Sequence, residues 1–246
     1  MTRKGARSRA GIDPAVLVDL NAGTAETLTL SECLAVDFAA LMPAVLPAAD
    51  PTRLRAAAND GITRRMALAA ELALELGGGA VVAELARHRS DTVRGWAAYA
   101  IAAETGLSLA QRLERIRPLA DDPHFGVREW AWLALRPHVV AEPLATLDLL
   151  APWTAEASPF LRRFASEATR PRGVWCAHIR CLRADPAPGL AVLGPLRADT
   201  HRYVQDSVAN WLNDAAKDHP DWVRHVLESW REEVPAYVAK RAARSL

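Results

Sequence analysis

A short motif returns three times along the chain at a fixed interval. It occurs as Val93-Arg94-Gly95-Trp96-Ala97, as Val127-Arg128-Glu129-Trp130-Ala131 and as Leu161-Arg162-Arg163-Phe164-Ala165, so that the aligned arginines are 34 residues apart each time. A period of roughly 30 to 45 residues, with two amphipathic helices in each unit, is typical of HEAT and armadillo repeats. The motif therefore predicts an all-α chain that forms an α-solenoid of HEAT-like repeats.

Weaker copies of the motif flank these three. One begins at Ile62 and another at Tyr203, where Gln205 lies 43 residues after Arg162. Turn-forming residues separate the copies, and the glycine run at residues 77–79 predicts a helix stop. The alanine and leucine content favours helix throughout. We expect residues 11–246 to form a single HEAT-like repeat domain behind a flexible basic arm at residues 1–10.

The sequence has no features of a membrane or secreted protein. No apolar run reaches about 18 residues, and no apolar segment with a small-residue cleavage site follows the basic start. Cys33, Cys176 and Cys181 form an odd set without metal-ligand spacing or a disulfide framework, and His178 does not complete a metal site with them. We expect a cytoplasmic, reduced and monomeric protein with no cofactor and no metal.

Charge is distributed unevenly along the chain. The formal net charge is only +1, which argues against a protein that wraps nucleic acid with its whole surface. Residues 161–203, however, hold eight arginines against three acidic residues, a local balance of +5. Such a patch can neutralise several phosphates, and it can equally be a solvated face on which arginines pair with carboxylates. The sequence leaves both interpretations open.

Two predicted helices of this region carry carboxylates. The first runs to the residue before Pro171, where the α region is disfavoured, and it places Arg163, Glu167 and Arg170 on one face. The second begins near residue 203 and has both an apolar stripe and a polar side. The stripe consists of Val204, Val208, Trp211, Leu212 and Ala215, and the polar side of Tyr203, Ser207, Asn210 and Asp214. If the helices stack in parallel, Glu167 and Asp214 face the same groove.

Three blocks of the chain, in this order, carry a family resemblance. They are Leu20-Asn21-Ala22-Gly23 with Leu30-Ser31-Glu32-Cys33-Leu34-Ala35-Val36-Asp37-Phe38, then Arg162-Arg163-Phe164-Ala165-Ser166-Glu167-Ala168-Thr169-Arg170-Pro171-Arg172 with Trp175, and finally Tyr203-Val204 and Ser207-Val208-Ala209-Asn210 with Leu212-Asn213-Asp214 and Lys217-Asp218-His219-Pro220. With these blocks the chain resembles, over almost its whole length, the HEAT-like-repeat DNA alkylation-repair glycosylases, and the AlkC branch in particular. Members excise cationic alkylated bases such as 3-methyladenine, and in that branch also 3-methylcytosine, from DNA.

The resemblance implies roles for matching residues. Glu167 and Asp214 would be the catalytic carboxylates, Arg163 and Arg170 would position them or the DNA backbone, and Trp175 would lie beside the lesion. The expected catalytic residues are thus Glu167, Asp214 and Glu129, the last on the preceding repeat, and the residues expected to contact double-stranded DNA or the damaged base are Arg163, Arg170, Arg172, Trp175, Trp132 and Asn210.

These residue types suit the chemistry. An alkylated base that carries positive charge is a good leaving group without a general acid, so an ionised carboxylate near the sugar has only to stabilise an oxocarbenium-like transition state and orient water. An indole ring attracts a cationic base. Trp132 is the better candidate than Trp130 because it lies off the apolar stripe, and we expect Trp130 and Trp211 in the core. Lys217 is expected to pair with Asp214 at the surface, not to form a Schiff base.

The chain departs from the family pattern at two points. Gly173 and Val174 stand where a leucine–proline pair is expected, which would alter the pocket, and no immunoglobulin-like domain is expected before Leu246. Two other functions fit a repeat protein: binding of branched or damaged DNA without base excision, and binding of other proteins. The carboxylates among the arginines favour the enzyme, because a surface that only binds phosphate would gain from losing negative charge.

Overall fold

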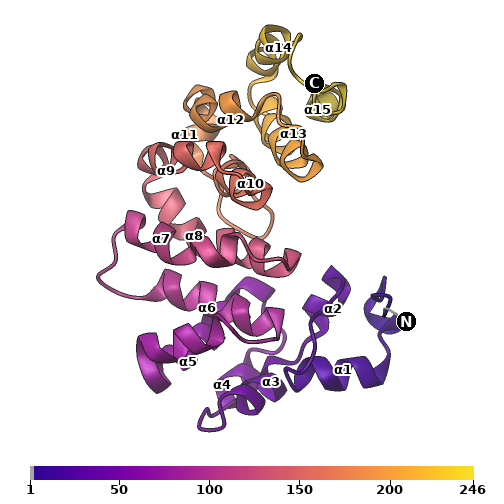
Figure 1. The fold of residues 1–246 in the computed structure, drawn as a ribbon, viewed down its shortest axis with the longest axis vertical. Helices are drawn as coiled ribbons and strands as arrows, with labels where there is room; N and C mark the ends of the chain where they lie inside the picture. The colour runs from indigo at the N-terminus through magenta and orange to yellow at the C-terminus, as the bar shows by residue number, and fades with distance from the viewer. Residues whose placement is uncertain (1–2) are drawn as a thin grey trace. The chain divides into compact units, whose positions relative to one another are not determined.

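The computed structural model describes residues 3–246, which form helices and turns without a strand (Figure 1). The described residues divide into two compact units at Ala134, inside helix α8 (Phe125–Ala141). We call residues 3–134 the N-terminal unit and residues 135–246 the C-terminal unit. The predicted all-α fold is confirmed, whereas the single repeat domain from residue 11 onward stays a prediction.

The N-terminal unit begins with short helices and continues with longer ones. Its elements are η1 (Arg9–Gly11), α1 (Pro14–Asn21), α2 (Leu30–Ala35), α3 (Phe38–Val45), α4 (Thr52–Ala56), α5 (Ile62–Leu85), α6 (Asp91–Ala103), α7 (Leu109–Ala120) and the first part of α8. Side chains fix several helix starts, because Asp13, Thr29, Asp37 and Ser108 accept backbone N–H groups at the beginnings of α1, α2, α3 and α7.

The C-terminal unit continues from the second part of α8. Its further elements are α9 (Pro143–Leu150), η2 (Ala151–Ala155), α10 (Pro159–Ala168), α11 (Arg180–Ala184), η3 (Ala187–Gly189), α12 (Leu190–Leu196), α13 (Arg202–Ala216), α14 (Pro220–Ser229), α15 (Ala236–Ala242) and η4 (Ala243–Ser245). Helix α13 packs against α10 and α15. The predicted stripe of α13, from Val204 to Ala215, is buried, and Trp211 at its centre is inaccessible to solvent.

The repeated arginine makes the same local contact in each copy of the motif. Arg94, Arg128 and Arg162 each donate from Nη1 to two backbone carbonyls of the turn before their own helix, six and five residues earlier. Gln205 keeps one such bond, 2.9 Å to the carbonyl oxygen of Asp199, also six residues earlier. The shared contact supports the predicted weak copy at residues 203–208.

Two of these arginines also bind a carboxylate further along the chain. Arg94 donates through Nε and Nη2 to Asp122 at 2.8 and 3.2 Å, and Arg162 binds Asp199 in the same way at 2.6 and 3.3 Å. A guanidinium that binds both oxygens of a carboxylate holds it in one orientation. The motif therefore ties each of these helices to its own preceding turn and to a later one.

The glycine of the first motif copy marks a point of close helix packing in the N-terminal unit. A β-carbon added to Gly95 would lie 2.6 Å from Met66 of α5 and 2.6 Å from Trp130 of α8. Neighbouring Trp96 is fully buried and meets Phe38 edge to face, with ring centroids 5.4 Å apart. Helix α6 thus has room for a backbone but not for a side chain at position 95.

Helix α5 breaks at the predicted glycine stop. Gly77 and Gly78 leave the helical region, and Gly78 has a φ of 55°. By length and hydropathy alone α5 would be long enough to cross a membrane. The break leaves residues 62–76 and 79–85, and each of these segments is shorter than the about 20 residues that a span requires.

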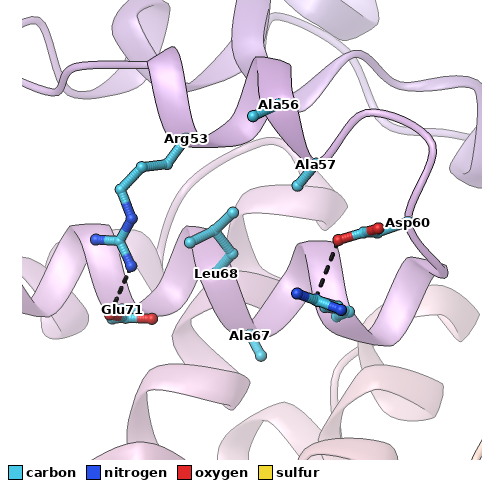
Figure 2. Close-up of a pocket in the computed structure, with 8 residues that line it drawn as sticks. Arg53, Ala56, Ala57, Asp60, Ala67, Leu68 and Glu71 are labelled. Atoms are coloured by element: carbon cyan, nitrogen blue, oxygen red, sulfur yellow. Dashed lines mark hydrogen bonds and ion pairs between the residues drawn. The ribbon is translucent and has the colours of Figure 1, made fainter.

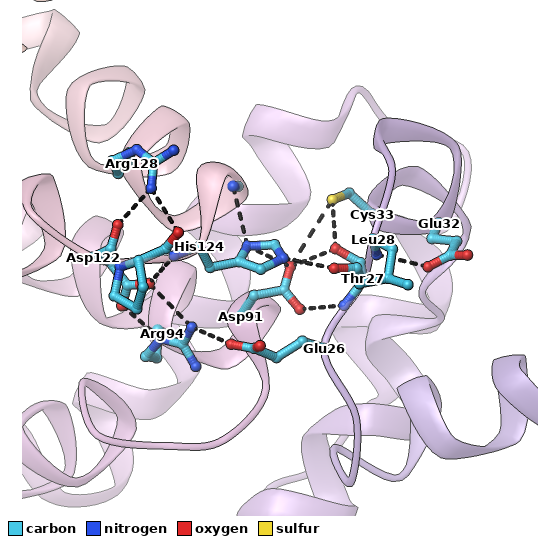
Figure 3. Close-up of polar contacts among 12 residues, drawn as sticks. Glu26, Thr27, Leu28, Glu32, Cys33, Asp91, Arg94, Asp122, His124 and Arg128 are labelled. Atoms are coloured by element: carbon cyan, nitrogen blue, oxygen red, sulfur yellow. Dashed lines mark hydrogen bonds and ion pairs between the residues drawn. The ribbon is translucent and has the colours of Figure 1, made fainter. Parts of the chain in front are cut away.

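Figure 3 shows a polar cluster that joins the segment before α2 to the beginnings of α6 and α8. Asp91 accepts both the backbone N–H of Thr27 at 2.9 Å and its hydroxyl at 2.7 Å, and His124 Nε2 lies 2.6 Å from the Thr27 carbonyl oxygen. Cys33 lies beside them, where burial and the charge of Asp91 raise the pKa of its thiol to about 12. A thiol that stays protonated is a poor nucleophile, so the cluster is a structural joint.

The described part of the predicted basic arm lies against α2. Arg3 Nη1 and the backbone N–H of Ala6 both donate to Glu32 at 2.8 Å, and the Thr29 hydroxyl donates to the Ala6 carbonyl at 2.6 Å. Burial alone would raise the pKa of Glu32, but these donors lower it below its ordinary value. Residues 1–2 of the arm lie outside the described residues, and its flexibility stays a prediction.

Candidate active site

The two carboxylates singled out in the sequence meet in the C-terminal unit through one arginine. Arg170 Nη1 donates to Glu167 Oε1 at 2.7 Å, while its Nε and Nη2 lie 2.9 and 2.8 Å from Asp214 Oδ2. Glu167 belongs to α10 and Asp214 to α13, and both are buried. The packing of these two helices therefore brings the predicted carboxylates together in a buried position, while the expectation that both face one groove stays a prediction.

Glu167 has further partners on both helices. The Ser207 hydroxyl donates to Glu167 Oε2 at 2.7 Å, and Arg163 Nη1 lies 3.4 Å from the same oxygen. Ser166 in turn donates to the Ser207 oxygen at 2.7 Å. Burial alone would raise the pKa of Glu167, but Arg163, Arg170 and the Ser207 hydroxyl outweigh it and lower the pKa below its ordinary value. The carboxylate is therefore ionised at neutral pH.

Helix α10 ends earlier than predicted. It stops at Ala168, so Arg170 is not part of the helix but of the turn that follows it. The Thr169 hydroxyl folds back to the Ala165 carbonyl at 2.9 Å, and the Trp211 indole N–H donates to the Thr169 carbonyl at 3.1 Å. These side-chain donors satisfy carbonyls that a longer helix would have bound itself. The early end turns Arg170 toward Asp214.

A residue that the sequence did not single out donates hydrogen bonds to further backbone carbonyls after Glu167. Arg136 of α8 is 1% exposed and donates to the carbonyls of Ala168, Arg170 and Ala177 at 2.9, 2.8 and 2.8 Å. Helical periodicity assigns an arginine to the surface. Only its place directly after the apolar run from Trp132 to Leu135 could have indicated that it is buried.

The loop at residues 171–179 presents Trp175. The backbone N–H of Ile179 donates to the Pro171 carbonyl at 3.0 Å and closes the loop. Trp175 is 49% exposed and has a φ of 62°, a left-handed conformation that is rare for residues with a β-carbon. Its neighbour Val174 is also exposed. The predicted lesion-contacting tryptophan is thus displayed next to the segment that carries Arg170.

Other predicted contact residues are occupied by partners within the protein. Arg172 Nη2 donates to Asp218 at 2.6 Å, and Asn210 accepts from Arg241 Nε at 2.9 Å. Lys217 lies 3.3 Å from Asp214 Oδ1, as predicted, and its side chain is 44% exposed. The roles of Arg172 and Asn210 in DNA contact stay predictions.

Glu129 and Trp132 lie in the N-terminal unit and contact each other. The Trp132 indole N–H donates to Glu129 Oε2 at 2.8 Å. The sequence places Trp132 off the apolar stripe, whereas the structure buries it to 6% exposure, with the indole N–H satisfied by Glu129. Trp130 and Trp211 are in the core, as predicted. The catalytic role of Glu129 and the base-contacting role of Trp132 stay predictions.

Ion pairs neutralise much of the arginine-rich segment. Arg172 and Arg183 share Asp218, Arg197 pairs with Glu233, and Arg202 approaches Asp206. Hydrogen bonds from Arg183 and Arg172 lower the pKa of Asp218 well below its ordinary value, in spite of some burial. The sequence left open whether these arginines bind phosphates or pair with carboxylates. In the structure, most of them pair with carboxylates. Arg180 is exposed and forms no ion pair with the residues that the structure describes.

A hollow in the N-terminal unit is unrelated to these residues. It has a volume of about 500 Å³ and lies between α4 and α5 (Figure 2). Arg53 and Glu71 pair across it at 2.6 Å, and Arg64 pairs with Asp60 at 3.0 Å. Its charges are balanced and none of the predicted site residues lines it. The candidate site is therefore the carboxylate cluster of Glu167, Arg170 and Asp214, not this hollow.

The sequence model of the DNA alkylation repair enzyme family matches residues 127–246, which include the carboxylate cluster and the Trp175 loop. This part of the chain is similar to the members of that family. The Bacillus subtilis protein YhaZ, which is uncharacterized, is 35% identical over 140 residues, or 56% of this chain and 38% of its own length.

Two solved structures are similar to this chain in fold. The alkylpurine DNA glycosylase AlkC of Pseudomonas fluorescens, bound to DNA with an abasic site analog, is 30% identical with a TM-score of 0.66, over 84% of this chain and 60% of that one. AlkD2 of Streptococcus mutans, at 19% identity, has a TM-score of 0.61 over 78% of this chain and 95% of its own. The likeness confirms the HEAT-like helical repeat class. The chain spans well under two thirds of YhaZ and 60% of AlkC.

Proposed function

We propose that this protein is a DNA glycosylase that removes cationic alkylated bases from double-stranded DNA. The lesions are of the 3-methyladenine type, with 3-methylcytosine as a second candidate. The observation that carries the proposal is the cluster in which Arg170 joins Glu167 and Asp214 beside an exposed Trp175. The family match of residues 127–246 and the likeness to AlkC support it.

The electrostatics of the cluster suit the cleavage of a bond to a cationic base. Glu167 and Asp214 are acceptors for the positive charge that develops on the sugar, and Glu167 stays ionised because Arg163 and Arg170 lower its pKa. A carboxylate next to the sugar also orients the attacking water. Arg163 and Arg170 would hold the carboxylates in place, and these ion pairs partly neutralise the two arginines. Contacts to DNA phosphates are therefore expected from more exposed residues such as Arg180.

The product would be an intact abasic strand. Lys217 is the lysine next to the cluster, and its ammonium pairs with Asp214 while its side chain is 44% exposed. A Schiff-base lysine requires a desolvated pocket, whereas Lys217 is paired with a carboxylate and is in contact with water. The proposed enzyme is therefore monofunctional, and we place it as a monomer in the cytoplasm.

Base release tests the proposal. The protein is incubated with duplex DNA treated with a methylating agent, and the free bases are separated by chromatography and identified by mass. The proposal predicts 3-methyladenine among the products and retention of neutral adducts such as 1,N6-ethenoadenine in the DNA. Tight binding to the same DNA or to branched DNA without any released base would favour a non-catalytic DNA-binding protein instead.

A further inference from the structure

Arg136 is a buried cation without a carboxylate partner among the described residues. Its side chain belongs to α8 and is 1% exposed. The guanidinium donates hydrogen bonds to the backbone carbonyls of Ala168, Arg170 and Ala177. Burial lowers the pKa of Arg136 below its ordinary value, although neighbouring Cys176 acts in the opposite direction. A buried charge is unfavourable for stability compared with an apolar residue of the same volume. The advantage of Arg136 therefore lies in the backbone geometry that its hydrogen bonds fix.

The three carbonyls belong to the segments that carry the site. Ala168 directly follows Glu167, Arg170 bears the guanidinium that joins both carboxylates, and Ala177 is two residues after Trp175. A planar guanidinium fixes the directions of its hydrogen bonds, so carbonyls that bind it are held at set distances from one another. The partial negative charge at the end of α10 also stabilises the buried cation.

The Trp175 loop needs such support. A left-handed φ is unfavourable for a tryptophan, and only surrounding contacts can maintain it. Inside the loop, Gly173 lies against Cys176 so closely that an added β-carbon would overlap the sulfur, and it would lie 3.6 Å from Arg136 Nη2. The loop is therefore folded on the guanidinium of Arg136, and Gly173 leaves the space that Cys176 occupies.

We propose that Arg136 is a positioning residue that sets the placement of the Trp175 loop relative to the Glu167–Arg170–Asp214 cluster. It touches neither base nor sugar and acts through the backbone of both segments. Its effect on base excision rests on the proposed function, whereas its effect on the loop does not. Small displacements at an active site cost on the order of 10-fold to 100-fold in rate, which sets the size of the expected effect.

Arg136→Lys is the main test, because lysine keeps the charge but loses the planar fork, and Arg136→Met is the stronger change. Arg112→Lys is a matched control. Arg112 is also buried, and its Nη1 donates to the carbonyls of Ile101 and Ala102 at the end of α6, at 2.9 and 2.8 Å. It offers the same kind of contact in the N-terminal unit, which does not contain Glu167, Arg170 or Asp214.

Hydrogen exchange of residues 171–179 and acrylamide quenching of Trp175 report the loop, the latter as the difference from the same protein with Trp175→Phe. We expect faster exchange at Ile179 and stronger quenching in Arg136→Lys but not in Arg112→Lys. In single-turnover excision, the rate constant should fall by on the order of 10-fold in Arg136→Lys with little change in DNA affinity.

The outcomes separate the two proposals. Loop exchange and quenching equal in Arg136→Lys and Arg112→Lys would overturn the positioning role. If Arg136→Lys loosens the loop but keeps the parent's excision rate, the placement of the loop does not serve the reaction. This result would also overturn the positioning role of Arg136. If the parent protein releases no base, the proposed function fails, while exchange and quenching still decide whether Arg136 holds the Trp175 loop.

Discussion

Replacing Arg170 by methionine tests the electrostatic design of the carboxylate cluster. The side chain of Arg170 is 13% exposed and lies between Glu167 and Asp214, whose side chains are 4% and 5% exposed. Methionine keeps most of the volume and removes the charge. The variant therefore leaves two buried carboxylates without the cation that joins them.

The structure gives the size of the loss. Removing one partner of a buried ion pair costs about 3–5 kcal/mol, since the other partner stays buried. In the variant Glu167 would still have Arg163 and Ser207, and Asp214 would still have Lys217. These remaining partners place the expected loss in free energy of unfolding at the lower end, about 3 kcal/mol at pH 7.

The loss should depend on pH with a defined sign. The folded-state pKa of Glu167 is lowered, so this group contributes stability above its ordinary pKa of 4.5, and the contribution disappears as the pH falls through the lowered value. Without Arg170, the pKa of Glu167 rises, because only Arg163 and the Ser207 hydroxyl then oppose the effect of burial, and this contribution to stability becomes smaller. The difference in stability between parent and variant should therefore shrink between pH 7 and pH values below 4.5.

Urea unfolding followed by circular dichroism measures these differences. Arg53→Met is the control, because Arg53 pairs with Glu71 and Glu75 but its side chain is 46% exposed, and such pairs contribute about 0–1 kcal/mol. The reasoning is refuted if Arg170→Met loses no more stability at pH 7 than Arg53→Met does. It is also refuted if the loss is undiminished at low pH.

Further predictions concern packing, DNA binding and the product. Gly95→Ala should cost about 1–3 kcal/mol of unfolding free energy, because its methyl group would meet Met66 and Trp130, and a urea midpoint equal to the parent's would contradict this packing. DNA affinity should fall with rising salt, and Arg180→Ala should make the slope of log affinity against log salt smaller by about 1 if Arg180 contacts a phosphate. Filter binding from low to physiological salt measures the slope, and a parental slope excludes that contact. Borohydride should trap no covalent enzyme–DNA complex, and a trapped band on a denaturing gel would require a Schiff-base lysine.

Local sequence patterns predicted the helices well. The 34-residue spacing of Arg94, Arg128 and Arg162 predicted a repeat, and the structure gives these side chains one shared contact with the preceding turn. The polar side of α13 correctly included Ser207 and Asp214. Each of these features depends on residues within one helix or one repeat, where periodicity is informative.

The parts that the sequence did not predict depend on contacts between distant segments. Arg136 binds carbonyls 32 to 41 residues away, and backbone carbonyls leave no mark in the residue types that supply them. The DNA-contact roles of Arg172 and Asn210 rest on the family resemblance and stay predictions, but the sequence did not show that Asp218 and Arg241, 46 and 31 residues away, bind these two side chains. Helix α10 ends earlier than the sequence predicted, because Arg136 of α8 and Trp211 of α13 donate to the carbonyls of Ala168 and Thr169 at its end.

The most direct test of the account is the single-turnover rate of 3-methyladenine release by the parent, Asp214→Asn and Asp199→Asn. Asp199 is the matched control, because its side chain is 6% exposed and Arg162 holds it as Arg170 holds Asp214. The account predicts that Asp214→Asn lowers the rate constant by on the order of 100-fold with DNA affinity retained or improved, while Asp199→Asn keeps a rate near the parent's. Equal rates for Asp214→Asn and the parent would contradict the central claim that this carboxylate cluster carries out base excision.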